Sequence, residues 1–242
     1  MKIAVIGGTG LIGSQVVKDL NAAGHEAVPH SKSTGIDVVS GEGLDEAVAG
    51  ADVLVNLTNS PTFDEASPAF FQASMDNLLA AGRKSGIRHF VILSIVGVDR
   101  VPELDYYRAK ALQENILAAG PIPYSIVRAT QFMEFMEAVL SWTADNDTVR
   151  LPATPIQPIA SKDVAAAVAE VAAGAPLGGI RNIAGPEVFT LDELGRITLA
   201  HKSDGRTVVT DPTAGMFAAV KGDVLTDTEA RLAPTRYTDW LS

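Results

Sequence analysis

A tyrosine and a lysine four residues apart, Tyr106 and Lys110, have a spacing that could do chemistry. Residues four apart share one face of a helix, and the helical pattern over residues 105–117 contains both. A lysine ammonium beside a phenol favours the phenolate, so we expect Lys110 to lower the pKa of Tyr106 and make it a proton donor or acceptor near neutral pH. Ser94 ends the strand predicted before this helix, where its hydroxyl could hydrogen-bond a substrate oxygen. The alternative is an ordinary exposed Tyr–Lys pair.

The chain begins with an apolar strand, residues 3–6, that enters a glycine-rich turn, and a helical pattern follows from Leu11. Glycine is needed in such a turn because a Cβ forbids the backbone angles and keeps a diphosphate away from the main chain. The helix N-terminus offers free N–H donors and a partial positive charge. We therefore predict a dinucleotide cofactor, with the alternative of a glycine turn that binds no ligand. The predicted contacts are Gly7, Thr9, Gly10, Leu11, Ile12 and Gly13.

The end of the second predicted strand, residues 26–30, bears on which dinucleotide binds. An NAD site usually places an acidic residue about 20 residues after the glycines, to hold the ribose 2′-hydroxyl. This chain has Ser31 and Lys32 there instead, and the next acidic residue is Asp37. A lysine with neighbouring hydroxyls could bind a 2′-phosphate, so we predict NADP rather than NAD. The alternative is that Lys32 is a solvated loop lysine.

Thr58 and Asn59 follow the apolar strand predicted over residues 52–57. Cofactor sites gather at the carboxyl ends of such strands, so both side chains could contact the dinucleotide. The alternative is that they belong to an ordinary turn, for which Asn, Ser and Pro are typical.

Strand and helix patterns alternate along the first half of the chain, which predicts an α/β fold with a doubly wound parallel sheet, the Rossmann architecture. We expect residues 1–242 to form a single domain with a dinucleotide-binding core, 1–128, and a small C-terminal αβ substrate lobe, 129–242. The six predicted strands cover residues 3–6, 26–30, 37–40, 52–57, 88–94 and 125–127.

Beyond residue 128 a helical pattern over residues 131–142 carries aromatic and methionine side chains. Such residues at helical spacing are most often core. Their place after the last predicted strand also makes them candidates for an apolar wall that faces the substrate. The candidate substrate-binding residues are Gln131, Phe132, Met133 and Met136.

The composition excludes several functions. The net charge is −10 and no basic run is present, which argues against a nucleic-acid surface. The chain has no cysteine, and its four histidines lack the spacing of metal ligands, so we expect no disulfide and no metal. We expect no membrane span, because no apolar run approaches about 20 residues. We also expect no signal peptide, because the first residues form a strand followed by glycines and not a charged segment with a long apolar one. These features predict a cytoplasmic protein whose partner is a small molecule, with a homodimer left open.

Several segments together resemble the atypical short-chain dehydrogenase/reductases, specifically their NmrA-like and NAD(P)H-binding branch. They are GGTGLIG at 7–13, SIVGVD at 94–99, YYRAK at 106–110, RATQF at 128–132, and QPIA at 157–160 with DVA at 163–165. The resemblance covers nearly the whole chain. It implies a Rossmann fold, a dinucleotide at residues 7–13, a C-terminal substrate lobe, and Ser94, Tyr106 and Lys110 as a reductase triad.

The branch that the chain resembles contains quinone and enone reductases, redox sensors and tailoring enzymes of aromatic polyketide pathways. The favoured hypothesis is an NAD(P)H-dependent oxidoreductase that reduces a quinone, enone or ketone, with a flat aromatic substrate. In it Tyr106 transfers the proton, Lys110 tunes the phenol and holds the nicotinamide ribose, and Ser94 positions the substrate oxygen. Two alternatives stay open: an oxidative, monooxygenase-like tailoring enzyme, and a non-catalytic NmrA-like redox sensor that binds dinucleotide.

Overall fold

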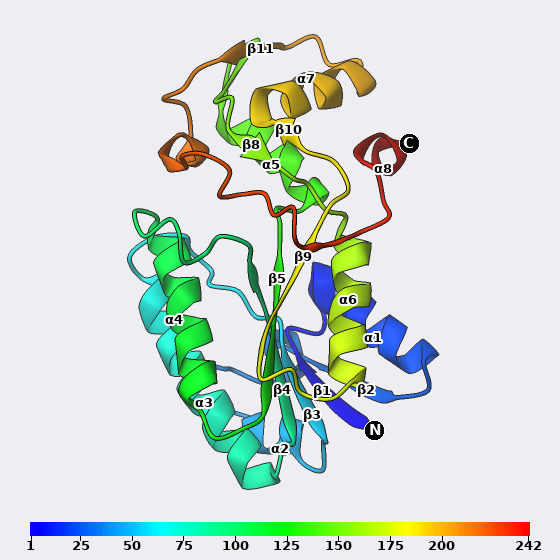
Figure 1. The fold of residues 1–242 in the computed structure, drawn as a ribbon. Coiled ribbons are helices and arrows are strands. Elements are labelled where there is room, and N and C mark those ends of the chain that lie inside the picture. Colours follow the sequence, from blue (N-terminus) through cyan, green and yellow to red (C-terminus); the bar gives the residue numbers. More distant parts are fainter. The chain divides into compact units, whose positions relative to one another are not determined.

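The computed structural model describes residues 1–242 and contains a seven-stranded sheet with the order β12-β9-β5-β4-β3-β1-β2 (Figure 1). Strand β1 pairs in parallel with β2 and β3, and β3 pairs in parallel with β4. Parallel neighbours require crossover connections, which helices supply here. This confirms the predicted α/β, doubly wound parallel sheet. The strands are β1 Lys2–Ile6, β2 Glu26–His30, β3 Val53–Asn56, β4 His89–Ile95, β5 Tyr124–Ala129, β9 Gly179–Ala184 and β12 Arg231–Leu232.

The chain divides into two compact units, the first made of residues 1–128 and 164–181, the second of residues 129–163 and 182–242. The predicted division into a dinucleotide-binding core, 1–128, and a substrate lobe, 129–242, stays a prediction. That the whole chain folds as a single domain stays a prediction. The helices with residues in the first unit are α1 Leu11–Ala22, α2 Leu44–Val48, α3 Ser67–Ser85, α4 Asp105–Ala119 and α6 Ser161–Ala173, the last of which begins in the second unit.

The core of the first unit fixes the carboxyl ends of its strands. Strand β3 is buried along its whole length, and Leu54 lies in register with Ala4 on one side and Phe90 on the other. These side chains pack with apolar residues of α3 and α4, including Leu78 and Leu117, which are fully buried. Burial of side chains of this size contributes about 1.5–3 kcal/mol each. The loops that follow β1, β3 and β4 therefore start from a rigid edge.

The predicted third strand, residues 37–40, is wrong. After β2 the chain forms one 3-10 turn, η1 Lys32–Thr34, and then a series of turns. Glycines with positive φ, Gly35 at +89° and Gly41 at +83°, break the extended path. Asp37 strengthens the turn because its carboxylate accepts the N–H of Val39 at 2.8 Å. The first half of the chain therefore supplies five strands to the sheet, not six.

The second unit contains the remaining elements, some of which differ from prediction. The helix predicted over residues 131–142 begins only at Met136, because residues 131 and 132 are extended and Phe132 forms a parallel bridge with Ile159. A small sheet has the order β11-β7-β6, and β8 pairs with β10. No helix is both long enough and apolar enough to cross a membrane. The elements are η2 Met133–Phe135, α5 Met136–Trp142, β6 Ala144–Asp145, β7 Thr148–Leu151, β8 Pro155–Ile156, β10 Phe189–Thr190, α7 Leu191–His201, β11 Thr207–Thr210, η3 Met216–Ala219 and α8 Tyr237–Leu241.

Candidate functional site

The glycine turn between β1 and α1 contains glycines that the fold itself requires. A Cβ on Gly13 would stand 2.1 Å from the carbonyl oxygen of Gly7, and a Cβ on Gly8 would stand 2.7 Å from that of Val5. Gly7 has a φ of +79°, which side chains rarely adopt. Gly10 is different, because its φ is −77° and its nearest obstacle lies 3.3 Å away. The absence of a side chain at Gly10 therefore leaves the main chain open to a ligand.

The N-terminus of α1 lacks an internal partner for its N–H groups. Gly10 is the N-cap residue and offers no side-chain hydrogen bond, and the first turn contains no acidic residue. The first N–H groups of a helix and the positive end of its dipole remain available for an anion in such a case. Leu11 is also 55% exposed, so the turn is accessible. The residues at this turn fit the diphosphate of a dinucleotide.

The glycine turn lies against the loop after β3. A Cβ on Gly7 would meet the backbone of Leu57 and Thr58 at about 3 Å, so this approach too requires glycine. Asn56, at the end of β3, fixes the loop because its side-chain oxygen accepts the N–H of Thr58 at 3.0 Å and the hydroxyl of Thr58 at 2.7 Å. The structure thus brings together Thr58 and the glycine turn, which the sequence predicted only separately.

Asn59 connects this loop to α4. The hydroxyl of Tyr106 donates a hydrogen bond to Asn59 Oδ1 at 2.6 Å, and the N–H of Ser60 donates to the same oxygen at 3.0 Å. The ring of Phe63 packs edge-on against Tyr106, with 4.8 Å between centroids, and Phe71 lies at 6.4 Å. Sequence reasoning missed this cluster, because no local pattern joins the loop after β3 to a helix almost 50 residues later.

Tyr106 does not have the lowered pKa that its spacing from Lys110 predicted. Burial raises the pKa of Tyr106 to about 12, although the hydrogen bond to Asn59 opposes this shift. Desolvation disfavours the phenolate, and the ammonium of Lys110 forms its hydrogen bonds with other groups. Tyr106 is therefore protonated at neutral pH, which suits a proton donor better than a base.

Lys110 is buried and its ammonium is bound by the protein. Its Nζ donates to the carbonyl oxygen of Leu93 at 2.7 Å and to Gln113 Oε1 at 2.5 Å, and lies 5.1 Å from the centroid of the Phe71 ring. Burial lowers the pKa of Lys110 to about 8, while the negative charge of Glu114 opposes the shift. Gln113 and Glu114 were missed at the sequence level, although positions three and four residues beyond Lys110 on a helix are a signal that could have found them.

Ser94 follows Leu93 directly and lies near the carboxyl end of β4. Its hydroxyl oxygen is buried and has no hydrogen-bond partner. Buried hydroxyls are nearly always hydrogen-bonded, so an unpaired one indicates a group that a ligand can satisfy. Lys110 contacts β4 at Leu93, the residue directly before Ser94.

The segment predicted to bind the adenosine ribose continues from the glycine turn. The N–H of Gly7 donates to the carbonyl of His30 at 2.8 Å, which places Ser31 and Lys32 beside the turn. The Lys32 ammonium forms an ion pair with Asp37 at 3.2 Å and is 78% exposed. Burial, followed by the charge of Lys2, lowers the pKa of His30, so its imidazole adds no positive charge here at neutral pH.

The residues predicted to bind substrate lie in the second unit. Met133 and Met136 are buried, as side chains of a core would be, whereas Gln131 and Phe132 are half-buried. A role in substrate binding stays a prediction for all four. No three His, Asp or Glu side chains gather closely enough to hold a metal ion.

Comparison with known proteins shows the family. The model of a family described as NAD(P)H-binding matches residues 7–174, so the chain belongs to this family. The match begins at the glycine turn and includes Ser94, Tyr106 and Lys110. It supports the resemblance that the sequence motifs indicated.

Individual relatives are distant. The chain is 28% identical over 151 residues to photosystem II assembly factor Ycf39 of Synechocystis sp., a match covering 55% of this chain and 46% of that protein. It is 27% identical over 205 residues to a divinyl chlorophyllide a 8-vinyl-reductase of Cucumis sativus, covering 69% and 48%. The chain thus spans about half the length of these curated relatives. The NADPH-dependent quinone oxidoreductase QOR2 of Escherichia coli, solved with NADPH, has a similar fold, with a TM-score of 0.68 and 22% identity over 87% of this chain and 78% of that one.

The lowered pKa of Lys110 predicts a pH dependence of stability. Between about pH 8 and pH 10.5, the unfolded chain holds the Lys110 proton while the folded chain has released it. The unfolded state then binds more protons, so stability rises with pH in this window. We expect the free energy of unfolding of the wild type, relative to Lys110→Met, to increase by about 3 kcal/mol across it. Urea unfolding at a series of pH values measures this difference.

Lys84→Met is the control for this measurement. Asp45 raises the pKa of the exposed Lys84, so no gain in stability should accompany the same rise in pH. If the free energy of unfolding of the wild type, relative to Lys110→Met, stays constant or falls between pH 8 and pH 10.5, Lys110 keeps its proton in this range, contrary to the structure.

Proposed function

We propose that this chain is an NAD(P)H-dependent oxidoreductase that reduces a quinone, enone or ketone, with a flat aromatic molecule as the favoured substrate class. The observation that carries the proposal is the half-buried, protonated phenol of Tyr106, which hydrogen-bonds Asn59 at 2.6 Å. Asn59 belongs to the same loop as Thr58, whose backbone contacts the uncapped glycine turn. A proton donor thus belongs to the same set of contacting residues as a dinucleotide-binding turn.

The chemistry follows from the state of each side chain. Bound NAD(P)H supplies a hydride. A substrate carbonyl that accepts a hydride at carbon develops negative charge on its oxygen, and Tyr106 gives that oxygen its proton and later regains one from water. A phenol with a pKa of about 12 is protonated at neutral pH and gives its proton to the more basic oxyanion when that forms. The unpaired hydroxyl of Ser94 hydrogen-bonds the same oxygen.

Two relatives support the class of substrate. One is named a vinyl reductase, and a protein of similar fold is named an NADPH-dependent quinone oxidoreductase. The first name describes the reduction of a vinyl group, and the second describes a quinone as the substrate. Phe63, 48% exposed beside Tyr106, offers an aromatic surface on which a flat acceptor can stack.

We infer that NADP is preferred to NAD. Lys32 is the second residue after β2 and begins a 3-10 turn capped by Ser31 and Thr34, and no acidic side chain lies between the end of β2 and Asp37. An acidic residue at the end of β2 would repel a 2′-phosphate, whereas Lys32 attracts it. Asp37 competes for the ammonium, so the phosphate must displace an exposed ion pair, which contributes about 0–1 kcal/mol.

A second function is a dinucleotide-binding protein without turnover. The observation in its favour is that two of the three groups of the predicted triad already have partners within the protein: Tyr106 donates to Asn59, and Lys110 donates to Gln113. One relative is named an assembly factor rather than an enzyme. Turnover assays separate the two functions.

Substitution of Tyr106 tests the proposed reduction. With NADPH and a panel of quinones, enones and ketones, we expect the wild type to oxidise NADPH and Tyr106→Phe to lower kcat about 10²–10⁴-fold, because the acid is lost. The Kd for NADPH should stay unchanged in Tyr106→Phe. Tyr124→Phe, on β5 and outside the site, is the control that keeps full activity. Undiminished kcat in Tyr106→Phe would exclude Tyr106 as the acid, and tight NADPH binding without turnover on any acceptor would favour the binding protein.

Substitution of Lys32 tests the cofactor preference. We expect Lys32→Gln to weaken NADPH binding about tenfold while NADH binding is unaffected, since only NADPH carries the 2′-phosphate. Asp37→Asn should strengthen NADPH binding, because it frees the ammonium but keeps the oxygen that accepts the N–H of Val39. Isothermal titration of both coenzymes measures these affinities. Equal losses for NADPH and NADH in Lys32→Gln would contradict the inference.

A further inference from the structure

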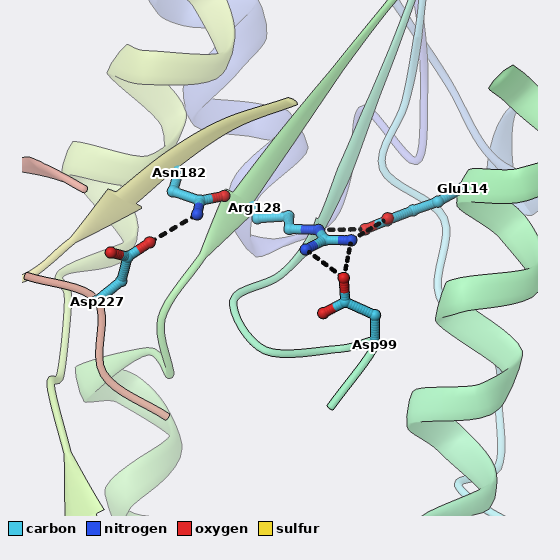
Figure 2. A network of polar contacts seen from close by, with 5 residues as sticks. All are labelled: Asp99, Glu114, Arg128, Asn182 and Asp227. Carbon is cyan, nitrogen blue, oxygen red and sulfur yellow. Dashed lines mark hydrogen bonds and ion pairs between the residues drawn. The ribbon is translucent and has the colours of Figure 1, made fainter. Parts of the chain in front are cut away.

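Arg128, Glu114 and Asp99 form an ion cluster that the chemistry above does not use (Figure 2). The guanidinium of Arg128 binds the carboxylate of Glu114 through two hydrogen bonds, Nε to Oε1 at 2.9 Å and Nη2 to Oε2 at 2.6 Å. Its Nη1 and Nη2 also donate to Asp99 Oδ2 at 3.2 and 3.3 Å. One guanidinium thus lies between two carboxylates.

The cluster joins the elements that carry the predicted triad. Arg128 lies on β5, Glu114 lies on α4 one turn beyond Lys110, and Asp99 lies in the loop that leads from Ser94 to α4. The side chains of Arg128 and Glu114 are 11% and 7% exposed, whereas Asp99 is 57% exposed. A buried ion pair contributes little net stability compared with apolar packing, so stability alone does not account for it.

The cluster also balances the charge of Lys110. Arg128 and Lys110 are two cations, and Glu114 and Asp99 are two anions, so the four charges sum to zero. Of the two anions, Glu114 acts on Lys110 directly, since its negative charge opposes the loss of the lysine proton. Arg128 orients the Glu114 carboxylate, because its guanidinium donates one hydrogen bond to each carboxylate oxygen.

The other groups that contact Lys110 carry no charge. They are the carbonyl of Leu93 on β4, the amide of Gln113 on α4 and the ring of Phe71 on α3. Tyr106, one turn earlier on α4, is a neutral phenol at physiological pH. Glu114 is therefore the charged group that compensates the buried ammonium.

We propose that Glu114, held in place by Arg128, is a positioning residue that keeps Lys110 charged, and that Arg128 and Asp99 tie β5 and the loop after β4 to α4 around the dinucleotide. The use of that charge toward the nicotinamide ribose rests on the proposed function. The effect of the cluster on the protonation of Lys110 does not rest on the proposed function, and it can be measured without any cofactor.

The test is the titration of Lys110 in variants of the cluster. NMR of protein with labelled lysine side chains follows the Lys110 signal, assigned by its absence in Lys110→Met. Glu114→Gln removes the compensating charge, and we expect the titration midpoint of Lys110 to fall by about one pH unit. Asp99→Asn removes a more distant, exposed charge, so a smaller fall of about 0.3 pH unit is expected.

Two matched controls separate charge from structure. Glu114→Asp keeps the charge and should leave the midpoint of Lys110 near its wild-type value. Glu170→Gln makes the same change at an exposed ion pair with Arg181 and should have no effect on it. If the cluster only stabilised the fold, its variants would have altered unfolding temperatures, but the titration midpoint of Lys110 would not fall consistently among them.

An unchanged or raised midpoint in folded Glu114→Gln would overturn the proposal. If Glu114→Gln does not fold, the variant Asp99→Asn, at an exposed position, provides the test. A titration midpoint of Lys110 that does not fall in Asp99→Asn would equally overturn the proposal. The pH dependence of NADPH affinity is the second readout, and its alkaline limb should move to lower pH in step with the Lys110 midpoint. Failure of the wild type to bind NADPH would contradict the proposed function alone, since the cofactor-free titration still tests the cluster.

Discussion

The constraint on which this structure depends is the glycine turn between β1 and α1, which leaves the N–H groups at the start of α1 without a capping side chain. The turn that exposes these groups is possible only because glycines at positions 7, 8 and 13 let β1, β2 and α1 approach closely, with no room for a Cβ. Gly10 adds the open space, and the first turn carries neither a capping side chain nor an acidic residue. An uncapped helix N-terminus in a family of NAD(P)H-binding proteins is best explained by a diphosphate ligand.

The candidate reaction site follows from that turn through a continuous set of contacts within the first unit. The glycine turn lies against Thr58, and Asn59, the next residue, accepts a hydrogen bond from the hydroxyl of Tyr106. The ring of Phe71 is near both the ring of Tyr106 and the ammonium of Lys110. Lys110 in turn holds the carbonyl of Leu93, which precedes Ser94. Burial then sets the chemistry, because it raises the pKa of Tyr106 to about 12 and lowers that of Lys110 to about 8. The two groups therefore keep or lose their protons by desolvation rather than by mutual attraction.

The sequence predicted the features that depend on local pattern. The glycine spacing, the apolar strands and the 3.6-residue periodicity of α3 and α4 are all local, and the structure has them nearly where expected. The strand predicted at 37–40 failed because glycines with positive φ turn the chain there. The lowered pKa of Tyr106 failed because spacing on a helix does not show which partners a lysine chooses once it is buried. The hydrogen bond from Tyr106 to Asn59 and the bonds from Arg128 to Asp99 join distant segments, so no local pattern could reveal them.

The most direct test of the account is calorimetric titration of NADPH and NADH into the wild type and into Gly10→Val. The φ of −77° at Gly10 suits valine, and its Cβ would stand 3.3 Å from the carbonyl oxygen of Gly7, which a shift of a few tenths of an ångström relieves. We therefore expect this variant to fold while its side chain fills the space in which a diphosphate would approach the main chain. The account predicts binding heat with the wild type and its loss in Gly10→Val at an unchanged unfolding temperature. Absence of heat with both coenzymes in the wild type, or undiminished binding in Gly10→Val, would contradict it.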